Sequence, residues 1–332
     1  MANAPDPSGT IKVLAIDGGG IRGIIPAIIL AALREQIGAD LHKVFDLISG
    51  TSTGGIIALG IGTASKADAG PYAPAELLNL YVQNGPAIFH TNLLTGPHQL
   101  IGPKYSPNAL EACLLKFFGA TKFSSALTPL LISSYDLQSQ LPFFFKSHMI
   151  SKDSSYDWNV TDIARSTSAA PTFFPPNHLT KGNEDYDLVD GGVFVNNPAM
   201  AAYAEARRLY PGAARIIVVR VGTGDVQNHI SFDEAKRWGL IGWARQIVPV
   251  LMDSTSEAVD YELEHVLGSD YFPLQPQNLS PASGAMDDIS AGNLTALQEV
   301  AHSYVTANAD LLNSIAALLK PLRGGTLSGI GN

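Results

Sequence analysis

The fold is decided by residues 45–59, which read FDLISGTSTGGIIAL. The first part of this stretch is a short run rich in Leu and Ile that is typical of a buried strand, and the last part is an apolar run typical of a buried helix. Between them stands Ser52, with Gly50 two residues before it and Gly54 two residues after it. A serine flanked in this way is the nucleophile-elbow pattern. The glycines are needed because the chain turns so sharply that a Cβ on either neighbour would collide with the strand or the helix.

A second strand, glycine loop and helix precede the elbow. Residues 11–16 read IKVLAI and predict a strand, residues 17–23 read DGGGIRG, and a helix is predicted from about residue 24 to residue 36. Two such units in succession form a βαβ structure, whose loops both lie at the carboxyl edge of a parallel sheet. Backbone N–H groups of the first loop could then serve as an oxyanion hole for Ser52, with Arg22 at the rim of that loop. An elbow sequence can also arise by chance, and a lone Arg can simply be a solvated surface residue.

The first loop also fits a different function. Gly18, Gly20 and Gly23 match the dinucleotide-binding fingerprint G-x-G-x-x-G. That function requires an acidic residue at the end of the second strand, where this chain has the Ser52 elbow, while Asp46 comes early in the strand and Asp40 precedes it. A dinucleotide-binding protein therefore remains a distant alternative. A Walker A phosphate loop is excluded, because no Lys-Ser or Lys-Thr follows the glycines.

Composition narrows the class of protein. Of the 332 residues, 46% are hydrophobic and only 15% are charged, against about 25% charged in a typical globular chain. The net charge of −9 and the lack of any basic run argue against a nucleic-acid partner. The single cysteine, Cys113, excludes an intrachain disulfide and a cysteine-based zinc site, and we expect neither a metal nor a cofactor.

Neither a targeting segment nor a membrane span is predicted. Residues 1–10 have no basic region and no apolar core of the kind found in secretory signals. The longest apolar run, residues 24–33, is well short of the roughly 20 residues that a membrane span needs. We expect a soluble protein that is cytoplasmic or peripheral to a membrane.

The rest of the chain predicts one α/β domain over residues 11–320, between a flexible N-terminus (residues 1–10) and a flexible tail (residues 321–332). Further strands are expected at residues 130–136, 141–145, 187–190 and 216–221. Further helices are expected at residues 73–84, 107–118, 160–170, 198–210, 233–267 and 293–319. A surface loop is expected at residues 92–105 and a Pro/Ser/Gly-rich connection at residues 268–292.

The base for Ser52 is not singled out among the histidines. Seven of them follow the serine, and none has the context of a strand end: His90, His98, His148, His178, His229, His265 and His302. Asp190 has this context, because it ends the strand 187–190 and is followed by a Gly-Gly turn. This third strand-to-glycine turn is expected at the same edge of the sheet, where a carboxylate could take the serine proton directly. The alternative is an ordinary Asp-Gly turn.

Taken together, these motifs resemble those of the patatin-like phospholipases. The resemblance rests on residues 17–23, 50–55 and 190–192 in that order, with further matches at residues 164–174, 193–198 and 286–288. It covers roughly residues 11 to 320 and implies a three-layer α/β/α fold with a mostly parallel sheet. It also implies a Ser–Asp catalytic dyad without a metal. In this sequence the family roles fall on Ser52 as nucleophile and Asp190 as base. The oxyanion hole falls on the N–H groups of Gly18, Gly19 and Gly20, with help from Arg22.

The resemblance also implies a range of substrates and roles. Family members cleave acyl esters of phospholipids, lysophospholipids or galactolipids, during transient contact with a membrane or micelle surface. Some plant members double as storage proteins, and some bacterial members are effectors switched on by cyclic dinucleotides. A lipid-binding or storage protein with incidental esterase activity, and a cyclic-dinucleotide-activated phospholipase, are therefore the open alternatives. The sequence predicts neither the headgroup preference nor the oligomeric state.

Overall fold

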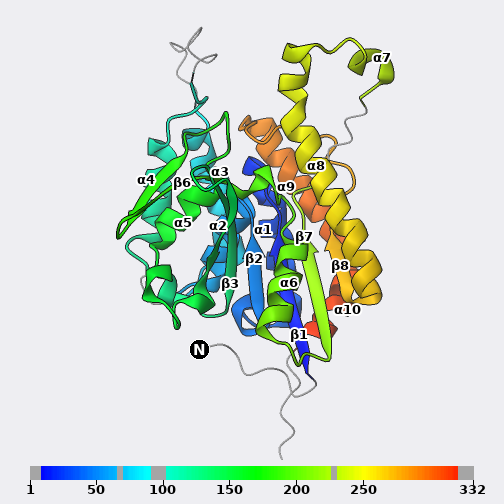
Figure 1. The fold of residues 1–332 in the computed structure, drawn as a ribbon. Coiled ribbons are helices and arrows are strands. Elements are labelled where there is room, and N and C mark those ends of the chain that lie inside the picture. Colours follow the sequence, from blue (N-terminus) through cyan, green and yellow to red (C-terminus); the bar gives the residue numbers. More distant parts are fainter. Residues whose placement is uncertain (1–8, 66–69, 91–101, 226–229, 321–332) are drawn as a thin grey trace, which may run out of the picture.

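An eight-stranded sheet forms the centre of the protein, with helices on both of its faces (Figure 1). The computed structural model describes residues 9–65, 70–90, 102–225 and 230–320. The strands are β1 (Thr10–Ile16), β2 (Leu47–Gly50), β3 (Leu130–Asp136), β4 (Leu141–Lys146), β5 (Asn177–Lys181), β6 (Glu184–Asp190), β7 (Arg215–Val221) and β8 (Tyr271–Leu274). Their order is β5-β6-β3-β2-β1-β7-β8, and β4 pairs with β3 outside this path. Strands β1, β2, β3, β7 and β8 are parallel to one another.

The helices form two unequal layers. They are α1 (Ile24–Ile37), α2 (Thr53–Gly62), α3 (Pro74–Ile88), α4 (Asn108–Phe118), α5 (Val160–Thr167), α6 (Ala199–Leu209), α7 (Phe232–Ala235), α8 (Leu240–Leu267), α9 (Ala291–Ala307) and α10 (Ala309–Leu319). On β1, Leu14 and Ile16 face a large core shared with α1, α2 and α9, whereas Val13 and Ala15 face a smaller core shared with α6 and α8. This alternation follows from the period of two along a strand, and it confirms the three-layer α/β/α fold with a mostly parallel sheet.

The predicted elements are present, with four differences. Strand β5 was missed because four of its five residues, NHLTK, are polar. Strand β8 was missed because it is only four residues long and contains a proline. The predicted helix 233–267 is interrupted before Leu240, and the predicted helix 293–319 is interrupted at Asn308. Most of the predicted loop 92–105 and nearly all of both predicted flexible ends lie outside the described residues.

The antiparallel strand β6 brings Asp190 to the elbow. Strand β4 pairs along nearly the whole of β3, so β2 and β6 must share the other edge of β3. On that edge Gly50 of β2 pairs with Ile132, and Asp190 of β6 pairs with Ser134. The carboxyl ends of β2 and β6 therefore meet end to end, because β6 runs in the opposite direction to β2. Asp190 therefore lies at the edge of the sheet that the sequence predicts. It reaches this edge on the antiparallel strand β6 and not on a parallel strand.

Within the described residues, no helix combines the length and the apolar character needed to cross a membrane.

Candidate active site

Ser52 occupies a strained elbow between β2 and α2. Its φ of 54° and ψ of −123° lie outside the regions that most L-residues adopt, which costs about 1–3 kcal/mol and is typical of functional sites. A Cβ on Gly50 would overlap the carbonyl of Gly54, and a Cβ on Gly54 would overlap the carbonyl of Ile16. The glycine spacing seen in the sequence thus has a steric cause. The N–H of Ser52 donates to the Thr167 hydroxyl at 2.9 Å, which helps to hold the turn.

Asp190 is the carboxylate beside this serine. The Ser52 hydroxyl donates a hydrogen bond to the Asp190 side chain, and the Gly192 N–H donates to Asp190 Oδ1 at 2.7 Å. The residue is only 2% exposed. Burial raises the pKa of Asp190 to about 7, although the hydrogen bonds from Ser52 and Gly192 act in the opposite direction. A carboxyl group with this pKa can accept a proton from an alcohol far more readily at neutral pH than an ordinary aspartate.

The glycine loop offers two uncommitted donors rather than three. The Gly18 N–H donates to the Asn196 carbonyl at 3.1 Å, so it is already in use. The N–H groups of Gly19 and Gly20 donate to no acceptor in the described part of the chain. Gly20 also lines the cavity that contains Ser52. The donors available to an oxyanion in this loop are therefore those of Gly19 and Gly20.

Arg22 lies behind the loop and not at its rim, which corrects the expectation from the sequence. Its side chain is buried and is not among the residues that line the cavity. Nε donates to the Gly19 carbonyl at 3.5 Å, and Nη1 donates to the Gly224 carbonyl at 3.2 Å. The C=O and N–H of one trans peptide point in opposite directions. By holding the Gly19 carbonyl, Arg22 therefore fixes the direction of the Gly20 N–H.

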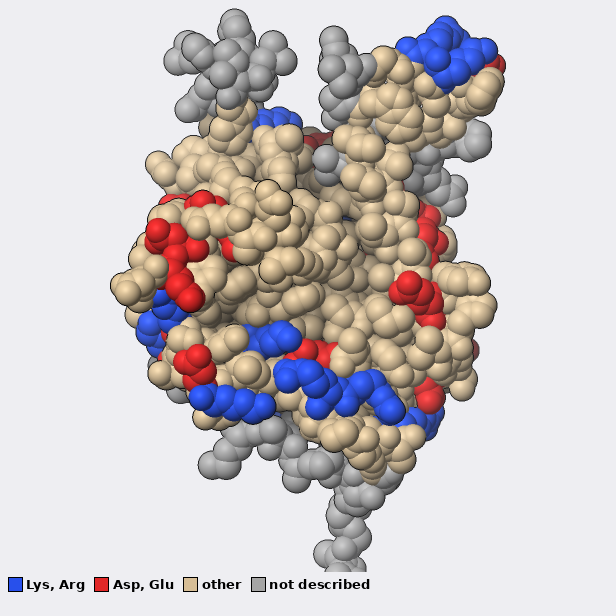
Figure 2. All heavy atoms as spheres, viewed as in Figure 1, with Lys and Arg blue, Asp and Glu red and all other residues tan. Residues whose placement is uncertain are grey.

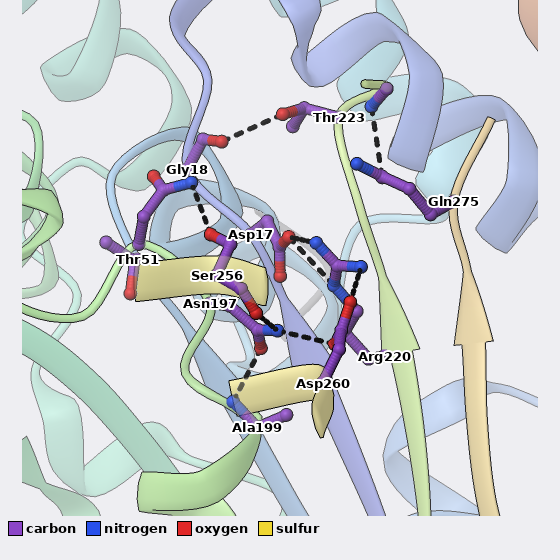
Figure 3. A network of polar contacts seen from close by, with 12 residues as sticks. Asp17, Gly18, Thr51, Asn197, Ala199, Arg220, Thr223, Ser256, Asp260 and Gln275 are labelled. Carbon is purple, nitrogen blue, oxygen red and sulfur yellow. Dashed lines mark hydrogen bonds and ion pairs between the residues drawn. The ribbon is translucent and has the colours of Figure 1, made fainter. Parts of the chain in front are cut away.

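A buried ionic network supports the other end of the loop (Figure 3). Arg220, at the end of β7, binds the Asp17 carboxylate through two nitrogens and donates to Asp260 of α8 at 2.8 Å. Burial raises the pKa of Asp17 to about 6, and Arg220 partly offsets this effect. The Thr223 hydroxyl donates to the Gly18 carbonyl at 2.9 Å. Arg220 was not among the site residues expected from the sequence, although an arginine inside an apolar strand signals a buried charge that needs a partner.

Two asparagines tie the Asp190 loop to α8. The Asn196 carbonyl accepts from Gly18, and its side chain donates to Ser256 at 3.3 Å. The Asn197 side chain donates to Asp260 at 2.9 Å, as Figure 3 shows. The glycine loop and the Asp190 turn are thus joined through α8. This role of α8 could not be predicted from local sequence patterns, because its contacts join residues about 60 positions apart.

A mainly apolar cavity of about 260 Å³ opens at Ser52 and Asp190. Besides these two residues, it is lined by Gly20, Ile21, Thr53, Ile56, Leu80, Tyr81, Gly85, Ile88, Phe89, Leu110, Ser168, Ala170, Pro171, Phe173, Phe174, Gly192, Val193, Leu251, Met252 and Met286. The largest parts of its wall come from α3 and from the segment that follows α5. Its shape and lining suit an alkyl chain with a polar end at the serine.

Neither competing site is assembled in the described residues. None of the cavity-lining residues there is a histidine; His148 binds Glu205 and His178 binds Asp187, while His98 and His229 lie outside the description. For a dinucleotide, Asp46 accepts from the Lys12 N–H near the start of β1, at the sheet edge opposite the glycine loop. The described ranges also contain no group of three or more His, Cys, Asp or Glu side chains that could hold a metal ion.

A three-layer α/β/α domain with a serine elbow beside a buried aspartate defines the class of protein. The chain belongs to the patatin-like phospholipase family, whose model matches residues 14–203. It is 30% identical to Patatin-like protein 1 of Arabidopsis thaliana over 96% of this chain and 87% of that protein. It is 33% identical to Patatin group J-1 of Solanum tuberosum over 89% of this chain and 84% of that protein.

Similarity to solved structures is weaker. The human GIVD cytosolic phospholipase A2 aligns with 92% of this chain and 60% of its own, with a TM-score of 0.45 and 11% identity. At the level of the family, the chain is a lipid acyl hydrolase.

Proposed function

We propose that this protein hydrolyses carboxylic ester bonds of phospholipids, lysophospholipids or galactolipids through a dyad of Ser52 and Asp190. One observation carries the proposal: the Ser52 hydroxyl donates to a buried carboxylate whose pKa is raised to about 7, at the polar end of an apolar cavity. This arrangement pairs a nucleophile with a base matched to neutral pH. The apolar walls supply a place for one acyl chain.

The first half of the proposed reaction forms an acyl-enzyme. Ser52 Oγ attacks the ester carbonyl carbon while Asp190 takes the serine proton. The N–H groups of Gly19 and Gly20 stabilise the negative charge that develops on the carbonyl oxygen. When this tetrahedral intermediate collapses, the C–O bond to the leaving alcohol breaks, and the alcohol leaves with the proton held by Asp190. The products are acyl-Ser52 and a free alcohol such as a lysolipid.

The second half releases the fatty acid. Asp190, ionised again, takes a proton from a water molecule as the water oxygen attacks the acyl carbon. The same two N–H groups stabilise the second oxyanion. Its collapse breaks the bond to Ser52 Oγ, which recovers its proton from Asp190. One water is consumed, and the enzyme returns to its starting state.

The test compares three substitutions on a panel of lipids and one soluble ester. Ser52→Ala and Asp190→Asn should each remove essentially all release of fatty acid, and Ser52→Ala should also abolish labelling by a fluorophosphonate. Ser168→Ala is the matched control, because Ser168 lines the same cavity but donates to the Ala164 carbonyl at 2.6 Å. If Asp190→Asn kept full activity and the substitution of a histidine abolished it, the base would be that histidine, and the site would be a triad and not a dyad. An unlabelled wild-type protein that releases no fatty acid would favour a lipid-binding or storage role.

A further inference from the structure

The helices α7 and α8 form a projection that the proposed reaction does not use. Figure 1 shows α7 and the first half of α8 extending past the body of the molecule at the top of the view. In the part of α8 whose side chains the structure describes, the first buried residue is Ser256. From there on the helix is anchored, through Ser256 and Asp260 and through Leu263 in the smaller core. We call residues 230–252 the α8 arm.

One face of the α8 arm carries an exposed apolar stripe. Trp243, Ile247 and Leu251 are 45%, 38% and 50% exposed. They are four residues apart, so they lie on the same face of the helix over about 12 Å. Phe232, in α7, is 80% exposed. Large apolar side chains gathered in this way mark a surface that contacts something else.

The stripe leads to the active site. Leu251 and its neighbour Met252 line the cavity that contains Ser52 and Asp190. The exposed face of the arm is therefore continuous with the apolar wall of the cavity. A partner that covers the stripe would lie at the mouth of the cavity, where the substrate enters. The geometry therefore favours the lipid aggregate that contains the substrate as this partner.

Charge indicates which kind of lipid surface fits. Between residues 240 and 252 the only charged residue is Arg245. At the tip, Asp233 and Glu234 balance Lys236 and Arg237. Figure 2 shows a small group of blue atoms, with red beside it, at the end of the projection, and mainly uncharged surface among the coloured residues between it and the body. With a net charge of −9 on the whole chain, a strongly anionic surface would repel the protein, so a zwitterionic or uncharged interface suits the arm.

Two aromatic residues add to this argument. Trp238 and Trp243 pack edge to face, with ring centroids 5.2 Å apart. Tryptophan is favoured where a protein meets the boundary between water and lipid, because its ring is apolar and its N–H is polar. The described stripe residues Trp243, Ile247 and Leu251 therefore suit the boundary of a lipid aggregate.

We propose that the α8 arm docks the protein on the zwitterionic or uncharged surface of a lipid aggregate and places the cavity mouth against it. This inference rests on the proposed function, because it assumes that the cavity takes its substrate from that aggregate. It concerns residues beyond the 14–203 range matched by the family model.

The binding test uses vesicles of phosphatidylcholine and protein carrying Ser52→Ala, so that no lipid is consumed. Trp243→Gln with Ile247→Gln removes two of the three stripe residues and leaves Leu251, which lines the cavity, unchanged. Fully burying one large apolar side chain in a lipid surface strengthens the partition of a protein onto that surface by roughly ten- to hundredfold. Since these two side chains are each somewhat under half exposed, the double substitution should weaken partition about tenfold or more. Phe232→Gln, at a separate site on the arm, should weaken partition by a similar factor, because Phe232 is 80% exposed, and it serves as a second variant if the first does not fold.

Val266→Gln is the matched control. Val266 lies on the same helix and is 55% exposed, but it is about 35 Å along the helix from Trp243. Its substitution should leave partition within twofold. Two of the three tryptophans are on the arm and the third, Trp158, is buried. Brominated phosphatidylcholine should therefore quench much of the emission, and replacing part of the lipid by phosphatidylserine should reduce binding.

An activity test separates this inference from the proposed function. With Ser52 intact, the double variant should hydrolyse p-nitrophenyl butyrate at the wild-type rate but release fatty acid from vesicles about tenfold more slowly. Equal vesicle binding and hydrolysis by the double variant and wild type would overturn the docking role while leaving the ester chemistry in place. A solution dimer that the double substitution dissociates would also overturn it, because a second copy would then cover the stripe. Hydrolysis of neither substrate by wild type would refute the proposed function, whereas vesicle binding would still test the arm.

Discussion

Replacing Asp190 by Asn should abolish activity and at the same time stabilise the protein in a pH-dependent way. The pKa of Asp190 is raised by burial from 3.8 to about 7. Between these values the native state keeps the proton and the unfolded state releases it. The native state then binds more protons, so the free energy of unfolding falls as pH rises through this window. An asparagine carries no such cost.

The magnitude follows from the size of the shift. About three pKa units at 1.36 kcal/mol each give roughly 4 kcal/mol as the full effect above pH 7. A measurement between pH 5 and pH 8 covers about two of these three units, from pH 5 to the pKa near 7. The free energy of unfolding of the wild type should therefore fall by roughly 3 kcal/mol over this range because of Asp190. Asparagine is nearly the same size as aspartate, and its Oδ1 can still accept from the Gly192 N–H. The stability difference between the variant and wild type should therefore be small near pH 4 and should grow with pH.

Urea unfolding of Asp190→Asn and wild type at several values between pH 5 and pH 8 measures this difference. The m-value of the variant should be unchanged. Asp288→Asn is the control: hydrogen bonds from Ser290 lower the pKa of Asp288, so its titration lies below this range and its effect should be constant. A stability difference for Asp190→Asn that does not change between pH 5 and pH 8 would refute the raised pKa, and with it the basis for Asp190 as a base at neutral pH.

Two further predictions concern the reaction itself. Because Asp190 acts in its ionised form, kcat/KM of the wild type on a soluble ester should rise with pH and level off above a midpoint near 7; a midpoint near 4 would contradict this. Arg22→Met should lower kcat with little change in KM, since the side chain orients the Gly20 N–H and does not line the cavity. The loss should approach the roughly 10²–10³-fold caused by removing one oxyanion donor, and a kcat within threefold of wild type would show that Arg22 only fills space.

The sequence by itself determined the local geometry of the site. The glycines around Ser52 predict a sharp strand-to-helix turn. Only residues without a Cβ fit beside the Gly54 and Ile16 carbonyls. The nearly continuous apolar run in residues 11–16 predicts a strand with two buried faces, which already implies helices on both sides of the sheet. Asp190 could be chosen because it ends a short strand and precedes two glycines. Each of these inferences depends on neighbours a few residues away.

Tertiary structure decided which groups are free to act. Ser52 and Asp190 meet because β2 and β6 share one edge of β3, a pairing that joins segments more than 130 residues apart. The Gly18 N–H is taken by Asn196, so the candidate donors reduce to Gly19 and Gly20. Partners from distant parts of the chain decide whether a backbone N–H group already has an acceptor. They also decide how far burial raises the pKa of a carboxyl group. Those partners exist only once the sheet and α8 have assembled.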